Sequence, residues 1–265
     1  MSDATFHFER GTAPLLISIP HLGTEIPPAI AGRLTPEALT LADTDWHLDR
    51  LYAFARRLGA SVISARYSRY VVDLNRPRSG ESLYPGQTTT GLFPLETFRG
   101  ELVYRAGEAP QAEEQALRAE RYWQPYHAQL EAELHRLRED HGQALLWDGH
   151  SIASVLPRLF EQQLPDLNLG TNSGASCGAD VFQGVLDVVQ VQQRYSWVSN
   201  GRFKGGYITR HYGQPQQGIH AIQLEMSQCV YMDETAPFAY REGLAGQVQP
   251  LVERMVEAAL ARVRS

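Results

Sequence analysis

The chain has 265 residues, a formal net charge of −6, 43% hydrophobic residues and 20% charged residues. This balance is ordinary for a folded globular protein, and the length suits a single domain over residues 1–265. The negative charge, with no segment dense in lysine or arginine, argues against nucleic-acid or anionic-membrane partners. No stretch approaches the roughly 18–20 apolar residues that cross a bilayer, and the N-terminal segment lacks the features of a secretory signal, so we expect a cytoplasmic protein.

Apolar runs and helical periodicities alternate along the chain, which predicts an α/β fold. We expect a three-layer α/β/α domain with a mixed, mostly parallel sheet. Pro125 should kink or split the longest helix. The polar segments 76–110 and 161–180 are long enough to be functional loops. The predicted strands are 15–19, 61–65, 70–74, 144–148 and 219–226, and the predicted helices are 46–58, 111–140 and 237–263.

Two histidines follow short apolar runs and precede small turn residues. His21 follows the predicted strand 15–19, and His150 follows the predicted strand 144–148. The carboxyl ends of parallel strands are where open α/β sheets bind ligands, so these imidazoles should lie together at one edge of the sheet. A catalytic zinc ion takes three protein ligands of this kind and keeps one position for water. The pattern predicts a zinc site.

The third metal ligand has several candidates. Glu25 lies four residues after His21, and the run 43–47 contains Asp43, Asp45 and His47. Capping of a helix start by Asp43 or Thr44 would explain one of the two acids. The other acid and His47 would still be unexplained, and we favour Asp45.

The run from Tyr67 to Pro77 suggests a carboxylate-binding element. In strand geometry, Asp73 and Asn75 share a face while Val72 and Leu74 face the core, and Arg76 emerges at the strand end. The planar guanidinium of arginine binds carboxylates through two hydrogen bonds, and a neighbouring amide adds another. The competing interpretation is an exposed structural ion pair between Asp73 and Arg76.

A carboxylate interrupts the apolar strand 219–226. The period of two places Gln223 and Glu225 on one face. A carboxylate in such a strand is costly unless it is paired or functional, and a glutamate near a zinc site is the usual general base for hydrolysis. We therefore predict Glu225 as the base.

Several motifs together resemble the N-formylglutamate amidohydrolase family. They are PHLGTEIP, DTDWHLDRLY, YSRYVVDLNRP, LWDGHS, GRFKGGYITRHYG and HAIQLEMSQCVYM, and they span residues 14–235. That family is similar in turn to zinc carboxypeptidases and aspartoacylases. The resemblance implies zinc-dependent hydrolysis of N-formyl-L-glutamate in histidine degradation. Its implied residues are His21 and His150 as ligands, Asn75 and Arg76 as carboxylate binders, and Glu225 as base.

The resemblance also leaves questions about ligands and substrate. The carboxypeptidase pattern has its acidic ligand three residues after the first histidine, where this chain has Thr24. Because the implied substrate has two carboxylates, Arg69 and Arg210 are further candidates for binding it.

Three alternatives compete with this function. The chain could be a zinc amidohydrolase for another N-acyl amino acid, because fold and metal chemistry do not fix the acyl group. It could be a non-catalytic protein that binds a metal and an acidic ligand. It could be a metal-free amidase that uses Cys177 or Ser151, although Ser151 lacks the Gly-x-Ser-x-Gly elbow.

Overall fold

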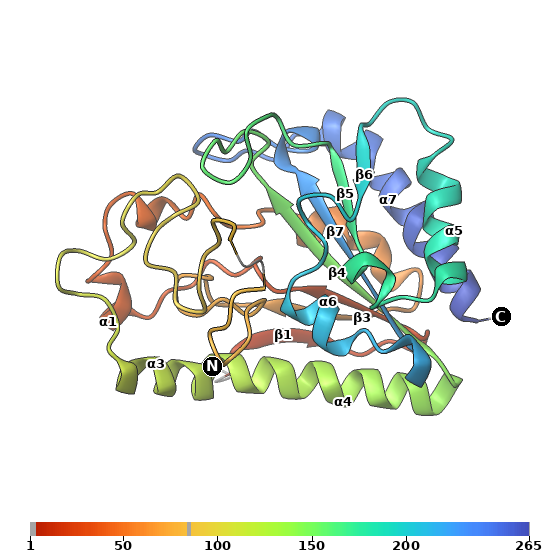
Figure 1. Cartoon of the computed structure of the whole chain (residues 1–265), viewed down its shortest axis with the longest axis horizontal. Helices are drawn as coiled ribbons and strands as arrows, with labels where there is room; N and C mark the ends of the chain where they lie inside the picture. The colour runs from red at the N-terminus through yellow and green to blue at the C-terminus, as the bar shows by residue number, and fades with distance from the viewer. Residues whose placement is uncertain (1–3, 84–85, 265) are drawn as a thin grey trace.

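One sheet organises the chain (Figure 1). The computed structural model describes residues 4–83 and 86–264. Over these residues seven strands lie in the order β1-β3-β2-β4-β7-β5-β6. The β1/β3 and β5/β7 pairs are antiparallel and the other pairs are parallel. The strands are β1 (Phe6–Glu9), β2 (Leu15–Ile19), β3 (Ser61–Ala65), β4 (Ala144–Ile152), β5 (Leu167–Gly170), β6 (Trp197–Ser199) and β7 (Ile219–Ser227).

Helices cover both faces of the sheet. Alternate residues of β2 divide between two apolar cores: Leu15 and Ile17 pack with α2, α5 and α7, whereas Leu16 packs with α1, α4 and α6. The predicted α/β/α layering with a mixed, mostly parallel sheet is thus confirmed. The helices are α1 (Pro28–Ala31), α2 (Leu48–Leu51), α3 (Ala112–Arg118), α4 (Gln124–His141), α5 (Ala179–Val189), α6 (Tyr207–Tyr212) and α7 (Glu242–Val263).

The strand predictions hold at the centre of the sheet. The expected strands 15–19 and 61–65 coincide with β2 and β3, and 219–226 lies within β7. Every residue of β2, β4 and β7 is buried, as expected for strands with helices on both sides. One correction concerns β4, which continues beyond residue 148 to Ile152. His150 therefore lies inside the strand, whereas His21 follows the end of β2 by two residues.

The predicted strand 70–74 is wrong. Its residues are buried but form turns, in which the Val71 amide donates to the Ser68 carbonyl. A carboxylate oxygen of Asp73 accepts from the Asn75 amide at 2.9 Å, a local bond that replaces a strand ladder. Val72 and Leu74 still pack into the core, as predicted. Burial alone therefore did not distinguish a strand from a packed turn.

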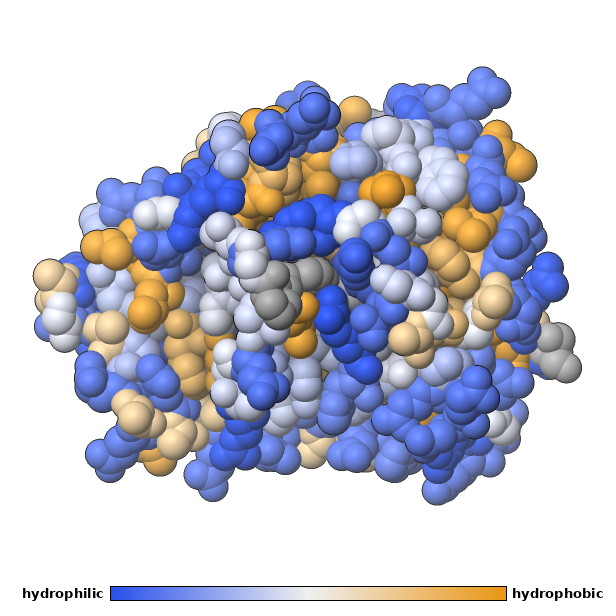
Figure 2. Space-filling model, in the orientation of Figure 1, coloured by the Kyte–Doolittle hydropathy of each residue, from blue (hydrophilic) through white to orange (hydrophobic). Residues whose placement is uncertain are grey.

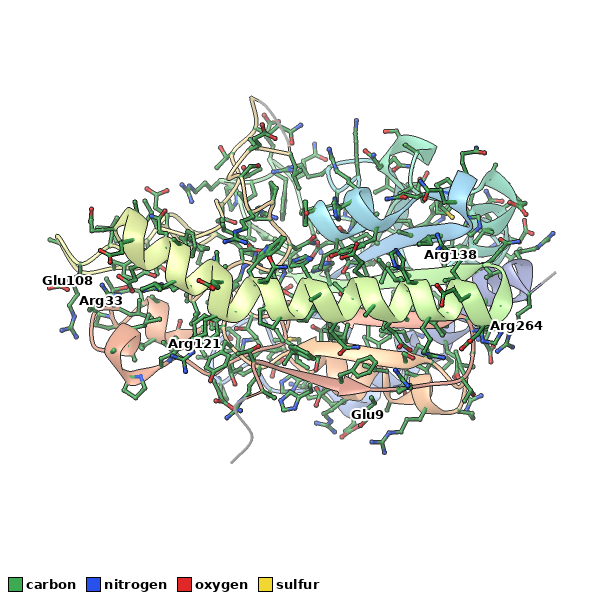
Figure 3. The ribbon with its side chains drawn as sticks, turned by 90° about the horizontal axis from the view of Figure 1, so that it is seen from below. Glu9, Arg33, Glu108, Arg121, Arg138 and Arg264 are labelled. Atoms are coloured by element: carbon green, nitrogen blue, oxygen red, sulfur yellow. The ribbon has the colours of Figure 1, made fainter. Side chains whose placement is uncertain are left out.

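The predicted helices occur at the expected positions in the chain, but their bounds differ from the prediction. The expected helix 111–140 is split into α3, a π-helical turn (Ala119–Trp123) and α4, with Pro125 in the first turn of α4. Figure 3 shows these segments as one rod along the molecule, with Arg138 near its far end. The expected helix 46–58 is only α2 and a 3₁₀ turn (Ala53–Arg56), and the last helix begins at Glu242.

The polar segments also differ from expectation. The described residues of the segment 76–110 are irregular. Residues 84–85 lie outside the described part of the chain. The expected loop 161–180 instead contains β5 and the start of α5. In the face shown in Figure 2, hydrophilic residues predominate and hydrophobic ones are scattered. None of the helices in the described part of the chain is both long and apolar enough to span a membrane.

Candidate metal centre and catalytic site

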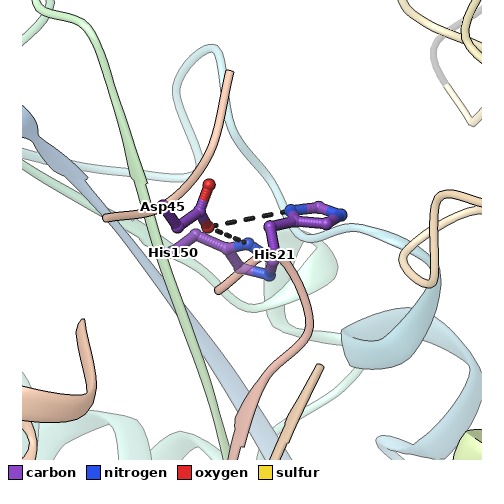
Figure 4. Close-up of side chains that lie close together, drawn as sticks. All are labelled: His21, Asp45 and His150. Carbon is purple, nitrogen blue, oxygen red and sulfur yellow. Dashed lines mark hydrogen bonds and ion pairs between the residues drawn. The ribbon is translucent and has the colours of Figure 1, made fainter. Parts of the chain in front are cut away.

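Three predicted ligands converge at the carboxyl edge of the parallel strands (Figure 4). The Asp45 amide donates to the His21 carbonyl at 3.0 Å, which brings the loop 43–47 against the end of β2. Asp45 Oδ2 lies 3.7 Å from His21 Nδ1 and 3.1 Å from His150 Nδ1. All three side chains are buried, and their candidate ligand atoms lie within 4.8 Å of one another.

Two further carboxylates orient the imidazoles. His21 Nε2 lies 2.7 Å from Asp73 Oδ1, and His150 Nε2 lies 3.2 Å from Asp148 Oδ2. When the Nε2–H of His21 donates to Asp73, the Nδ1 of His21 is left unprotonated, which is the usual arrangement of a metal-binding histidine. Both Nδ1 atoms face Asp45. The cluster therefore offers two nitrogens and a carboxylate oxygen to one point.

The charges around this cluster suit a divalent cation. The carboxylates of Asp45, Asp73, Asp148 and Glu225 are buried, whereas their buried basic contacts among the described residues are the Arg69 guanidinium, through Asp73, and the imidazoles of His21 and His150. Burial opposes ionisation of Asp45, but His150 and His21 outweigh it and lower its pKa. Buried anions in such excess are expensive without a counter-charge. The donor set and its charge both fit zinc.

Glu225 lies beside this cluster on the neighbouring strand. It is the register partner of His150 in the parallel β4/β7 pair. Burial raises the pKa of Glu225 to about 8, and the Asp45 carboxylate adds to the shift. Gln223 Nε2 donates to Glu225 Oε2 at 3.4 Å. A nearby cation would favour the ionised carboxylate that a general base requires.

The turn at 73–76 brings Asn75 and Arg76 to the same cavity. The Asn75 amide nitrogen lies 3.0 Å from His150 Nε2, and Asn75 Oδ1 accepts from the Ile208 amide. Arg76 is half-buried, and its guanidinium contacts the Thr90 and Asn75 carbonyls. The competing interpretation, an exposed ion pair between Asp73 and Arg76, is wrong. Asp73 is fully buried and pairs with His21 and Arg69.

Arg69 contacts the cluster through Asp73. Its Nη2 donates to Asp73 Oδ2 at 2.6 Å, so the chain of contacts runs from Arg69 through Asp73 to His21. Its guanidinium carbon lies 4.6 Å from the centre of the Phe98 ring. Arg69 lines the cavity, but its charge is largely directed at Asp73.

Other sequence candidates lie elsewhere. Arg210 is not among the described residues that line the cavity, and it donates to the Gly205 and Leu83 carbonyls. Glu25 pairs with Arg66, and His47 Nε2 donates to the Phe238 carbonyl. Asp43 caps no helix. Its Oδ2 accepts from the Phe98 amide, and the N-cap residue of α2 is His47, which makes no side-chain cap hydrogen bond.

The site also includes residues that the sequence did not suggest. Asp148 carried a usable signal, because residues two apart on a strand share a face and it precedes His150 by two. Arg202 carried no such signal. Gly206 lines the cavity and packs closely against Asn75, because an added Cβ would lie 2.3 Å from the Asn75 side-chain nitrogen. The remaining lining residues include Thr88, Thr89, Thr90, Phe98, Ser151, Ile152, Leu159, Phe203 and Gln223.

The metal-free alternatives find little support in the geometry. Burial raises the pKa of the Cys177 thiol to about 12, so this side chain is a poor nucleophile. The Ser151 hydroxyl lines the cavity and accepts from Tyr231 at 2.6 Å, with Gln228 at 3.4 Å. Neither partner is an imidazole that would activate a serine.

Comparison with known proteins identifies the family. The model of the N-formylglutamate amidohydrolase family matches residues 13–232. The chain belongs to the N-formylglutamate amidohydrolase family. Two relatives called N-formylglutamate deformylase, from Pseudomonas aeruginosa and Pseudomonas putida, are 53% and 51% identical to it, each over 98% of this chain and 97% of the relative. The chain is therefore an amidohydrolase.

Solved structures show the same fold for the N-formylglutamate amidohydrolase family. The crystal structure of N-formylglutamate amidohydrolase from Ralstonia eutropha has a TM-score of 0.79 and 23% identity, covering 98% of this chain and 97% of that one. A gene product of Agrobacterium tumefaciens has a TM-score of 0.73 and 16% identity, covering 98% and 96%. At these identities the likeness concerns the fold.

Proposed function

We propose that this chain hydrolyses N-formyl-L-glutamate to formate and L-glutamate, with one zinc ion held by His21, Asp45 and His150. The convergence of the two Nδ1 atoms and Asp45 Oδ2 beside Glu225 carries the proposal. The names of the two Pseudomonas relatives support the substrate. The reaction would end a route of histidine degradation, in the cytoplasm, and residues 1–265 would act as one amidohydrolase domain.

A zinc ion at this position would supply Lewis acidity, which polarises the formyl carbonyl and lowers the pKa of a water molecule toward about 7. The chain's own residues transfer the protons. Glu225 accepts a proton from the attacking water and then gives it to the amide nitrogen as the bond from that nitrogen to the formyl carbon breaks. Water and the formamide thus become formate and a free amine.

Asn75 and Arg76 are proposed to bind the α-carboxylate of the substrate. They follow Asp73 in the turn that contacts His21, and Asn75 also contacts His150, so a carboxylate bound there lies close to the ligands. Arg69 would hold Asp73, and thereby His21, in place. Arg210 would contribute to substrate binding from outside the cavity, through its hydrogen bond to the carbonyl of Gly205, which precedes the lining residue Gly206.

The test is formate release from N-formyl-L-glutamate before chelation, after chelation and after zinc is restored. Bound zinc is measured on the same samples. N-acetyl-L-glutamate and N-formyl-L-aspartate serve as comparison substrates. Turnover of the first substrate that follows zinc content supports the proposal. Turnover of another acyl amino acid alone would show that N-formyl-L-glutamate is not the substrate. Zinc binding without turnover of any of the three compounds would indicate a non-catalytic binding protein.

A further inference from the structure

The proposed substrate carries two carboxylates at different distances from the bond that breaks. The α-carboxylate is on the carbon that bears the amide nitrogen, whereas the side-chain carboxylate is separated from that carbon by two methylene groups. A site that selects this substrate therefore needs a second cationic group, farther from the ligands than Asn75 and Arg76.

Among the described residues, three arginines line the cavity, and two of them contact or adjoin residues beside the proposed metal ligands. Arg69 contacts Asp73, which contacts His21. Arg76 adjoins Asn75, which lies 3.0 Å from His150. These two side chains therefore serve the deep end of the cavity, where His21, Asp45 and His150 are buried.

Arg202 is anchored at a different place. Its Nε donates to the Leu159 carbonyl at 3.1 Å, and its Nη2 donates to the Thr88 carbonyl at 3.0 Å. Thr88 is exposed and Arg202 half-buried, which places this guanidinium nearer the mouth than the buried ligands. Two carbonyls from separate loops fix the direction of its planar group, so little conformational entropy remains to be lost on binding.

Part of the cavity wall is apolar. Phe98, Ile152 and Phe203 line the cavity and belong to one small hydrophobic cluster. Such a surface suits the two methylene groups of a glutamate side chain, because burying them removes apolar area from water. An acidic side chain lying along this wall would extend toward the mouth, where Arg202 lies.

We propose that Arg202 binds the side-chain carboxylate of the N-formyl amino acid and so selects an acidic side chain. This inference rests on the proposed function of the same site. Arg202 would determine specificity, whereas Asn75 and Arg76 would bind the carboxylate that every N-formyl amino acid carries.

The experiment compares N-formyl-L-glutamate with N-formyl-L-glutamine, which has an amide in place of the side-chain carboxylate. In Arg202→Met, kcat/KM for N-formyl-L-glutamate should fall by about 10- to 150-fold, the effect of losing one charge-assisted contact. The value for N-formyl-L-glutamine should change less than about threefold, because an amide gains little from a guanidinium. Arg202→Lys should retain part of the selectivity. Arg78→Met, at an exposed arginine that contacts Gln124, is the matched control.

The outcomes separate the two proposals. Equal losses on both substrates in Arg202→Met and Arg202→Lys, or unchanged selectivity in both, would overturn the role of Arg202 while wild-type turnover of N-formyl-L-glutamate stood. A wild-type enzyme that prefers N-formyl-L-glutamine would overturn the proposed substrate together with this inference. Melting temperature and bound zinc, measured for each variant, identify a loss caused by misfolding.

Discussion

His150 and Glu225 are register partners on the adjacent parallel strands β4 and β7. Partners in a parallel pair direct their side chains to the same face of the sheet, so the proposed ligand and the proposed base face the same cavity. Both residues are buried. The spacing between ligand and base is therefore set by the hydrogen-bonded sheet, which is more rigid than a loop.

Glu225→Gln should abolish most catalysis while leaving the metal in place. The amide cannot accept the proton of the attacking water, so kcat should fall by about 10²- to 10⁴-fold. Bound zinc should stay near the wild-type amount, because Glu225 is outside the ligand cluster. Formate release and zinc content are measured on one preparation. The exposed Glu131→Gln is the control, and near-normal turnover in Glu225→Gln would remove Glu225 from the mechanism.

Asp45→Asn and Asp43→Asn test the third ligand. Both residues are buried in the same loop, but Asp45 lies between the two imidazoles whereas Asp43 accepts from the Phe98 amide. An amide is a weaker ligand than a carboxylate, so Asp45→Asn should lose most of its bound zinc and Asp43→Asn should keep it. Elemental analysis after dialysis gives the zinc content. Loss of zinc in Asp43→Asn alone would exclude Asp45 as the ligand.

Asp73→Asn should weaken metal binding without removing a ligand. Asp73 Oδ1 lies 2.7 Å from His21 Nε2, and loss of such an orienting carboxylate typically costs about 10- to 100-fold in metal affinity. Competition with a chromophoric chelator measures the affinity. Asp140→Asn, at an exposed carboxylate on α4, is the control. An unchanged affinity in Asp73→Asn would mean that other contacts alone orient His21.

The sequence predicted the convergence of those candidate residues that follow or occupy short apolar runs. His21, His150 and Glu225 all lie on or just beyond central strands, whose parallel arrangement brings their ends together. Asp45 was selected by the density of acids in its loop, and the structure brings it to the same point. For these residues, local pattern and sheet topology were enough.

The partners of those residues were harder to predict, because they depend on contacts between distant segments. The one partner considered for Asp73 was Arg76, three residues away, yet Asp73 pairs with His21 and with Arg69. In the sequence, a buried turn has the same apolar pattern as a buried strand. The prediction of a strand at 70–74 therefore did not reveal that Asp73 pairs with His21 and Arg69. Arg202 reaches the cavity through two carbonyls on other loops, which no local pattern could indicate.

Trp123→Phe tests whether the π-helical turn before α4 positions the turn proposed to bind the substrate carboxylate. Trp123 Nε1 donates to the Arg76 carbonyl at 3.0 Å, and His127, four residues further on in α4, has its Nε2 2.8 Å from the Leu74 carbonyl. These two contacts flank Asn75. Burial lowers the pKa of His127 to about 3, so this imidazole is neutral and its contact does not change near neutral pH.

Phenylalanine keeps an aromatic ring at position 123 but is smaller than tryptophan and lacks its N–H, so one hydrogen bond worth about 0.5–1.5 kcal/mol is lost. We expect KM for N-formyl-L-glutamate to rise by about 2- to 10-fold while kcat and bound zinc stay near wild type, because the turn is proposed to bind substrate and the proposed ligands are untouched. Steady-state kinetics separate the two constants, and Trp197→Phe on the distant edge strand β6 is the control. A fall in kcat with a parallel loss of zinc would show instead that the helix supports the metal cluster as a whole.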